Sequence, residues 1–497
     1  MMIYGIDTFT FHDVLEIAKY PKLAKLNEQA KAQILKSQNN VRRIVESDRT
    51  VYGINTGFGP LCDTKISEEE TAQLQHNLII SHAVGVGNPI DKELSKIMMI
   101  CKIHALSKGF SGVSLEVIER MILMLEKDII PVVPEQGSVG ASGDLAPLSH
   151  LVLPLLGLGQ VWDNGKPHDT RIVLEENNLK PLRLGPKEGL GLINGTQFIL
   201  AHAIKGLEKM EYLLDLADLA AAMSLEAYRG SASPFKKQLH EIRPFPGSQS
   251  VAERMLMFLE GSENLKIHED CSRVQDPYSI RCVPQVHGAS RNAFEHLKAM
   301  AEIELNSVTD NPIVLSGEES ISGGNFHGQP LALPLDYATL AAAEIGNISD
   351  RRSYLLLEGK FGLPRLLTES SGLNSGFMIP QYTTAALVTE NKTLCFPASA
   401  DSIPTSLGQE DHVSMGSISG RKFNRVLDNL VPIFAVELMF AAQGLEFRRP
   451  ARCSEIVEEN YDILRSSVRK LTNDREIGKD ILAIAELIKD RAFIVNK

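Results

Sequence analysis

The chain has 497 residues, 43% hydrophobic and 23% charged, a composition that supports a large packed core. Its formal net charge is -11, and no dense run of Lys and Arg indicates a nucleic-acid-binding face. The first ten residues lack the basic start and apolar run of a secretory signal. We therefore expect a cytoplasmic protein with no nucleic-acid or membrane partner.

The first 195 residues show helical periodicity in short segments. These segments are 23–46, 67–83, 92–108 and 115–127. Residues 52–60 are too rich in glycine for a regular element and are interpreted as a loop. Asp163-Asn164-Gly165 predicts the turn of a small hairpin within 161–173.

After Asn194 the apolar segments become longer and richer in Ala, Leu and Glu. They are 196–228, 289–307, 331–346 and 423–445, and shorter charged helices are expected from Arg448 onward. Several are apolar nearly all round, which favours burial among other helices or at a subunit interface. Residues 430–447 are interrupted by Pro432, Glu437 and Glu446 and predict a core helix, not a membrane span.

These patterns predict a mainly α fold. We expect an N-terminal part of shorter elements, residues 1–195, followed by a long-helix bundle with C-terminal helices, residues 196–497. The six cysteines are scattered and form no C-x-x-C pair. Reduced thiols are therefore expected, with no disulfide framework and no bound metal.

The segment from Gly137 to His150 is rich in glycine and contains Ala141-Ser142-Gly143. The Gly143 amide nitrogen can close onto the Ala141 carbonyl carbon. Loss of two waters, one through the Ser142 side chain, then leaves a methylene conjugated to carbonyls, which is a strong electrophile. Glycine at 143 avoids a Cβ that would crowd the nitrogen. A flexible loop is the alternative for the bare tripeptide.

Three further residues could serve such chemistry. Tyr52 lies in the Gly-rich loop, where a phenol with a lowered pKa could act as a general base, or could be an incidental surface group. His82 ends the predicted helix 67–83 and is either functional or a helix-end residue. Asn194 lies among glycines that let the backbone approach a bound group.

A second set would suit a carboxylate ligand. If Pro277 begins a helix, Gln275, Tyr278 and Arg281 lie three apart on one face. Arg binds carboxylates in a bidentate fork, and an intrachain salt bridge is the alternative.

Glu410 lies in Gln409-Glu410-Asp411-His412, which could instead be a helix N-terminus, where acids are favoured. Phe326 is the aromatic residue of the Gly-rich turn 323–328.

In this order, across about residues 45–445, the motifs together resemble the aromatic amino acid ammonia-lyase family. That family comprises histidine, phenylalanine and tyrosine ammonia-lyases and related aminomutases. The resemblance implies an ammonia-lyase-like fold and a 4-methylidene-imidazol-5-one group formed autocatalytically from Ala141-Ser142-Gly143. It also implies a homotetramer with active sites shared between subunits.

The resemblance further implies a role for each candidate residue. Tyr52 is the first candidate for the base that removes the β-proton, and Glu410 is the second. Arg281 would hold the substrate carboxylate. The remaining substrate-binding candidates are His82, Asn194, Gln275, Tyr278 and Phe326.

Ser81-His82 and Glu410 resemble the histidine-specific members of the family. A phenyl ring would leave His82 and Glu410 unpaired, whereas an imidazole can hydrogen-bond to both. The expected reaction is elimination of ammonia from L-histidine to give trans-urocanate, the first step of histidine degradation. Gln329 and Phe396 depart from the family pattern near this pocket.

Two alternatives stay open. A tyrosine or phenylalanine ammonia-lyase, or a 2,3-aminomutase, would use the same electrophile. A non-catalytic helical scaffold would keep the helices and leave Ala141-Ser142-Gly143 uncyclised.

Overall fold

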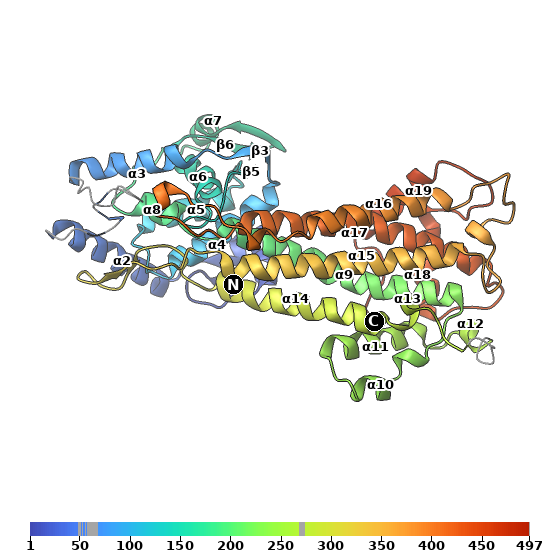
Figure 1. Ribbon diagram of the computed structural model, residues 1–497. Helices are drawn as coiled ribbons and strands as arrows, with labels where there is room; N and C mark the ends of the chain where they lie inside the picture. Colours follow the sequence, from blue (N-terminus) through green and yellow to red (C-terminus); the bar gives the residue numbers. More distant parts are fainter. Residues whose placement is uncertain (48–50, 52, 55, 57–67, 268–273, 497) are drawn as a thin grey trace. The chain divides into compact units, whose positions relative to one another are not determined.

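The structure, a computed structural model, describes residues 1–47, 51, 53–54, 56, 68–267 and 274–496. It is mainly α-helical with short strands, as predicted. The chain divides into two compact units, each built from three stretches (Figure 1). Unit 1 comprises Met1–Lys205, Leu297–Leu335 and Pro397–Arg421, and unit 2 comprises Gly206–His296, Asp336–Phe396 and Lys422–Lys497. A boundary between residues 195 and 196 stays a prediction.

Unit 1 holds the shorter helices of the N-terminal part. They are α1 (Phe11–Lys19), α2 (Glu28–Glu46), α3 (Glu68–His82), α4 (Lys92–Ser107), α5 (Leu115–Glu126), α6 (Leu145–Val152), α7 (Thr170–Glu176) and α8 (Glu188–Ile193). Helix α2 begins later than the predicted Leu23 because the Asn27 side chain caps it, accepting a hydrogen bond from Ala30 N. Asp91 and Ser114 cap α4 and α5 in the same way, so these two helices begin where the sequence predicts.

The strands in the described part of unit 1 form four small sheets. Strands β1 (Met2–Ile3) and β2 (Ala24–Lys25) pair in parallel, and β3 (Val86–Pro89) pairs antiparallel with β5 (Pro134–Gln136). Strand β6 (Gln160–Asp163) lies between β4 (Ile130–Pro131) and β7 (Lys166–Asp169), and β8 (Ile313–Val314) pairs with β9 (Ser320–Ile321). Asn164 and Gly165 both have positive φ between β6 and β7, which confirms the predicted hairpin.

Among the described residues, four helices are longer than the rest. They are α9 (Gln197–Tyr228), α14 (Val283–Leu305), α15 (Gln329–Leu357) and α17 (Gly416–Glu446), and their unit 2 segments lie side by side (Figure 1). Unit 2 also contains α10 (Lys237–Glu241), α11 (Pro246–Leu259), α12 (Glu263–Lys266), α13 (Tyr278–Arg281), α16 (Met378–Leu394), α18 (Glu455–Ser467) and α19 (Ile477–Lys489).

Helix α15 continues past its predicted end at Gly346. A Cβ at Gly346 would lie 2.9 Å from the Leu430 side chain of α17. This glycine therefore permits close helix packing and does not stop the helix.

Helix α17 is long and apolar enough to span a membrane by composition, but 83% of its apolar window is buried inside the protein. This burial fits the predicted core helix. In the described part of the chain, Cys101, Cys282, Cys395 and Cys453 are free thiols, whereas Cys62 and Cys271 lie outside it.

A buried ion pair explains the charge in the middle of α17. The Arg352 guanidinium donates to both Glu437 carboxylate oxygens, at 2.5 and 3.0 Å, and both side chains are fully buried. The hydroxyls of Ser224 and Ser349 donate to the same carboxylate at 2.8 and 2.5 Å. Helices α9, α15 and α17 thus meet at one satisfied charge.

Replacing Arg352 with Met should lower the free energy of unfolding by about 3–5 kcal/mol, because Glu437 would stay buried without its cation. Urea unfolding followed by circular dichroism measures the loss. Arg425→Met is the control, since Arg425 pairs with Glu390 on the surface and should cost no more than about 1 kcal/mol. Equal losses in the two variants would contradict the buried pair's role.

Candidate active site

Ala141 and Ser142 lie at the tip of a tight turn in unit 1. Gly140 and Gly143 form an isolated antiparallel bridge on either side of them. Ser142 has φ +52° and Gly143 has φ +82°, left-handed conformations that are costly for most residues. The turn therefore presents the Ser142 side chain on a constrained backbone.

Gly143 also lies against a second segment. It forms a parallel bridge with Gly195, and a Cβ at Gly143 would lie 2.0 Å from the Gly195 carbonyl oxygen. Asp144 N donates to the same oxygen at 2.7 Å. Only glycine at 143 allows this approach, which brings Asn194 beside Ser142.

Asn194 holds the Ser142 carbonyl. Its Nδ2 donates to the Ser142 carbonyl oxygen at 2.8 Å, and Gly195 N donates to the same oxygen at 3.4 Å. Among the described residues, Asn194 Oδ1 is buried without a hydrogen-bond partner. The side chain thus keeps one buried acceptor available at the turn.

Glu410 lies on the side-chain side of the turn. Ser142 Oγ donates to Glu410 Oε1 at 3.1 Å, while Thr405 Oγ1 and Ser406 Oγ donate to Oε2 at 3.0 and 2.6 Å. Thr405 N also donates to the Glu410 carbonyl at 2.9 Å. The helix-N-terminus interpretation of this segment is wrong, because Glu410 belongs to this bridged loop and α17 begins only at Gly416.

Asp144 ties the turn to the start of α9. Its buried Oδ2 accepts from Phe198 N and Ile199 N at 3.0 and 2.9 Å, and Ser138 Oγ donates to Oδ1 at 3.1 Å. Burial raises the pKa of Asp144 to about 7, and the three hydrogen bonds oppose that rise. The Asp144 carboxylate thus links the turn to α9, while Glu410 contacts Ser142 at its tip.

His82 ends α3, as predicted, and its Nδ1 lies 2.7 Å from the Leu78 carbonyl oxygen. Because that nitrogen must donate, neutral His82 keeps the proton on Nδ1 and presents Nε2 as an acceptor. Burial lowers the pKa of His82, and the Leu78 carbonyl and the Glu410 charge oppose that effect. The negative charge of Glu410 therefore acts on the His82 ring and raises its pKa.

The Gly-rich turn with Phe326 directly precedes α15. Phe326 is half-buried, and His327 Nε2 lies 3.2 Å from the carbonyl oxygen of His412. Gln329 Nε2 donates to the Ser399 carbonyl at 3.2 Å, whereas the Phe396 side chain is 82% exposed. Of the two departures from the family pattern, Gln329 thus begins α15 and is held by a hydrogen bond, whereas Phe396 faces solvent.

The expected helix face of Gln275, Tyr278 and Arg281 is wrong in one respect. Helix α13 begins at Tyr278 with Pro277 as its N-cap, so Gln275 lies before the helix and is exposed. The Arg281 guanidinium lies 4.7 Å from the centre of the Tyr278 ring, which is 71% exposed.

The Arg281 guanidinium has one buried nitrogen. Its buried Nε has no hydrogen-bond partner, and no salt bridge to it is present in the part of the chain that the structure describes. The described residues thus do not form the salt-bridge alternative, and residues 268–273, which lead into this segment, lie outside the described part. Gln275, Tyr278 and Arg281 belong to unit 2.

Tyr52 lies outside the described residues. Next to it, Gly53 N donates to Thr56 Oγ1 at 3.1 Å. Ile54 is buried with Val41, Ile44 and Val314. These contacts attach that part of the loop to unit 1.

Direct hydrogen bonds thus bring together Ser142, Asn194 and Glu410, and electrostatics links His82 to Glu410. Sequence analysis missed the residues that hold this set. Thr405 and Ser406 lay in a Ser-rich segment with no distinguishing signal. Lys102 donates to the Asn194 carbonyl at 2.7 Å, and its signal was a lysine in the apolar run Ile97–Leu106.

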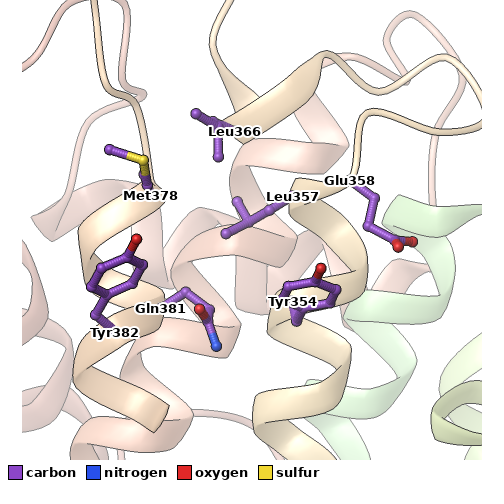
Figure 2. A pocket seen from close by; sticks show the side chains of 7 residues that line it. All are labelled: Tyr354, Leu357, Glu358, Leu366, Met378, Gln381 and Tyr382. Carbon is purple, nitrogen blue, oxygen red and sulfur yellow. The ribbon is translucent and has the colours of Figure 1, made fainter. Parts of the chain in front are cut away.

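A separate cavity of about 200 Å³ lies in unit 2 (Figure 2). Figure 2 shows its lining side chains from the end of α15, the start of α16 and the segment between them, and none of them is a predicted site residue. They are Tyr354, Leu357, Glu358, Leu366, Met378, Gln381 and Tyr382.

Residues 9–466 match the model of the aromatic amino acid lyase family, and the chain belongs to this family. It is 46% identical to the histidine ammonia-lyase of Alkaliphilus oremlandii, over 98% of this chain and 96% of that protein. The family and the helical fold that the sequence predicted are thereby confirmed.

Solved structures of family members resemble this chain over nearly its whole length. The histidine ammonia-lyase from Trypanosoma cruzi is 40% identical with a TM-score of 0.90, over 99% of this chain and 94% of that one. Tyrosine aminomutase from Streptomyces globisporus is 34% identical with a TM-score of 0.93, over 99% and 97%.

Gly143→Ala should destabilise the protein by more than about 3 kcal/mol, since a Cβ there meets both a positive φ and a backbone oxygen. Gly165→Ala is the matched control: its φ is +76° and nothing lies within 4 Å of the added Cβ. It should cost about 1 kcal/mol. Chemical unfolding of both variants decides the matter, and similar losses would rule out the close approach as the cause.

Proposed function

We propose that this protein eliminates ammonia from L-histidine to give trans-urocanate. The observation that carries the proposal is the hydrogen bond from Ser142 Oγ to Glu410 Oε1, with Asn194 on the carbonyl of the same serine. A reactive serine, a carboxylate and an amide converge there on one strained turn. The relatives named histidine ammonia-lyase support the same assignment.

The residues present fit a 4-methylidene-imidazol-5-one made from Ala141-Ser142-Gly143. The tight turn brings residues 140 and 143 together, and Gly143 has no Cβ to obstruct its amide. Asn194 Nδ2 and Gly195 N would hold the Ser142 carbonyl oxygen. The group would supply an electrophilic methylene, which turns a poor amine leaving group into a better one.

The chain's own groups then have distinct tasks. Donors from Asn194 and Gly195 stabilise negative charge at the Ser142 carbonyl oxygen. Arg281, with Tyr278, would bind the substrate carboxylate. Removal of the β-proton falls to Tyr52 or to Glu410, whose Oε2 is already held by two hydroxyls so that Oε1 faces the turn.

Two acceptors suit an imidazole side chain. His82 presents Nε2, and loss of the Ser142 hydroxyl on cyclisation would free Glu410 Oε1, so an imidazole N–H would have acceptors to meet. A phenyl ring would leave both without partners. The likeness to a tyrosine aminomutase keeps a tyrosine or phenylalanine lyase, or a 2,3-aminomutase, as the alternative within the class.

We also propose a cytoplasmic homotetramer with active sites shared between subunits. Tyr337, Leu340 and Tyr354 lie exposed along α15. Tyr382 adds a further exposed ring at the cavity of Figure 2. Exposed apolar side chains along one core helix are typical of a face that a second subunit covers.

Ser142→Ala should abolish urocanate formation, because the side chain that would become the methylene no longer carries a leaving hydroxyl. The measurement is an ultraviolet progress curve with L-histidine, with intact mass recorded for both proteins. Native protein should weigh two waters less than its sequence, and the variant should not. Ser466→Ala, an exposed serine on α18, is the control and should keep both the mass deficit and the activity.

Substantial turnover by Ser142→Ala would overturn the proposal. Native protein with the mass deficit but with product only from L-tyrosine or L-phenylalanine would retain the electrophile and replace the substrate. A native protein with no mass deficit and no product from any of the three amino acids would be the non-catalytic scaffold.

His82→Leu should lower kcat/KM for L-histidine by about 100-fold, since the substrate imidazole loses the half-buried acceptor His82 Nε2. It should affect turnover of L-tyrosine or L-phenylalanine far less. Steady-state kinetics on the three amino acids measure the ratio. His168→Leu, on the exposed strand β7, is the matched control and should leave kcat/KM at the native value.

A further inference from the structure

Lys102 is a fully buried cation beside the candidate site. It lies in α4 among side chains that are nearly all buried and apolar. Its Nζ donates to the main-chain oxygen of Asn194 at 2.7 Å. No salt bridge to Lys102 is present within the described residues, and the Asn194 carbonyl oxygen is the hydrogen-bond partner of its Nζ.

Burying the charge of a lysine at this depth costs desolvation free energy, so its presence calls for an explanation. A Leu or Met would pack in the same apolar environment without desolvating a charge. The second buried lysine of the region differs, since Lys187 is paired with Asp310 at 2.8 Å and donates to the Ser111 carbonyl at 2.7 Å. Lys187 thus belongs to a buried ion pair, whereas Lys102 forms no salt bridge with a described residue.

The carbonyl that Lys102 contacts belongs to the peptide that faces Ser142. In a trans peptide, the Asn194 oxygen and the Gly195 N–H point in opposite directions. Lys102 lies at the oxygen, and the Gly195 N–H points at the Ser142 carbonyl oxygen, 3.4 Å away. A cation at one end of such a chain polarises the peptide and strengthens the donor at the other end.

We propose that Lys102 is a positioning residue for the reaction: its ammonium polarises the Asn194–Gly195 peptide so that Gly195 N–H stabilises negative charge on the Ser142 carbonyl oxygen. The inference rests on the proposed function, in which that oxygen is conjugated to the electrophilic methylene. Asn194 Nδ2 is the direct donor, and Lys102 acts one peptide further away.

The environment of Lys102 makes its charge sensitive to pH. Burial lowers the pKa of Lys102, Asp310 and Asp144 raise it, and Lys187 lowers it further. Since the pKa is depressed, the charged form is present at lower pH and is lost as pH rises. The contribution of Lys102 should therefore fade on the alkaline side of the kcat profile.

The test is Lys102→Met in the full-length protein. The variant should retain the loss of two waters, show kcat lowered about tenfold with little change in KM, and lack the alkaline limb of the native profile. The expected factor is smaller than for removal of a direct donor because one peptide intervenes.

A second readout needs no substrate. Borohydride delivers hydride to the conjugated methylene and water supplies a proton, which adds two hydrogens to the mass. Negative charge moves toward the Ser142 carbonyl during that addition. The gain should therefore be about tenfold slower in Lys102→Met than in native protein.

Lys187→Met is the control for loss of a buried lysine. It should lower the unfolding temperature without slowing borohydride addition or lowering kcat. The alkaline limb should stay present and move to higher pH, because Lys187 no longer lowers the pKa of Lys102. If Lys102→Met does not fold, Lys102→Gln, which keeps a neutral donor, should show the same loss of the alkaline limb.

Native borohydride rates and a native pH profile in either variant would overturn the inference. A folded Lys102→Met without the mass deficit would also overturn it, because Lys102 would then act in cyclisation and not in turnover. The inference would also be overturned if kcat of the native protein did not fall on the alkaline side, because Lys102 loses its charge there. Failure of the proposed function is distinct, since native protein would then lack both the mass deficit and the turnover.

Discussion

The approach of Gly143 to Gly195 is the contact on which the rest of the candidate site depends. The two backbones lie so close that a single methyl group at 143 would overlap the Gly195 carbonyl. Because neither residue has a side chain, the turn with Ser142 lies directly on the segment with Asn194. Helix α9 begins two residues later, so one contact joins the turn to a helix of 32 residues.

Much of the fold could be predicted because its signals are local. Asp91 and Ser114 begin α4 and α5 by capping, and Asn164-Gly165 makes a hairpin turn in any context. The errors arise where the local signal is ambiguous. Gly346 was interpreted as the end of α15, but packing against Leu430 retains it inside the helix. Pro277 was placed within the first turn and instead caps α13, which leaves Gln275 outside the helix.

The sequence points to Ser142, Asn194 and Glu410 because they lie in unusual Gly-rich or polar segments, and the structure joins these three by hydrogen bonds. What holds them could not be predicted, because it depends on distant pairing. Nothing near Thr405 or Ser406 in the sequence shows that their hydroxyls meet Glu410 and turn its other oxygen toward Ser142. Lys102 was visible as an isolated charge in an apolar helix, but its target 92 positions away was not.

Ser142 and Glu410 are separated by 268 positions, yet both belong to unit 1, which is complete only when the stretch Pro397–Arg421 joins it. A chain made from its N-terminus folds its earlier segments first. The Ser142 hydroxyl therefore has no carboxylate until that late stretch has left the ribosome. A fragment that ends before Glu410 lacks this hydrogen bond to Ser142.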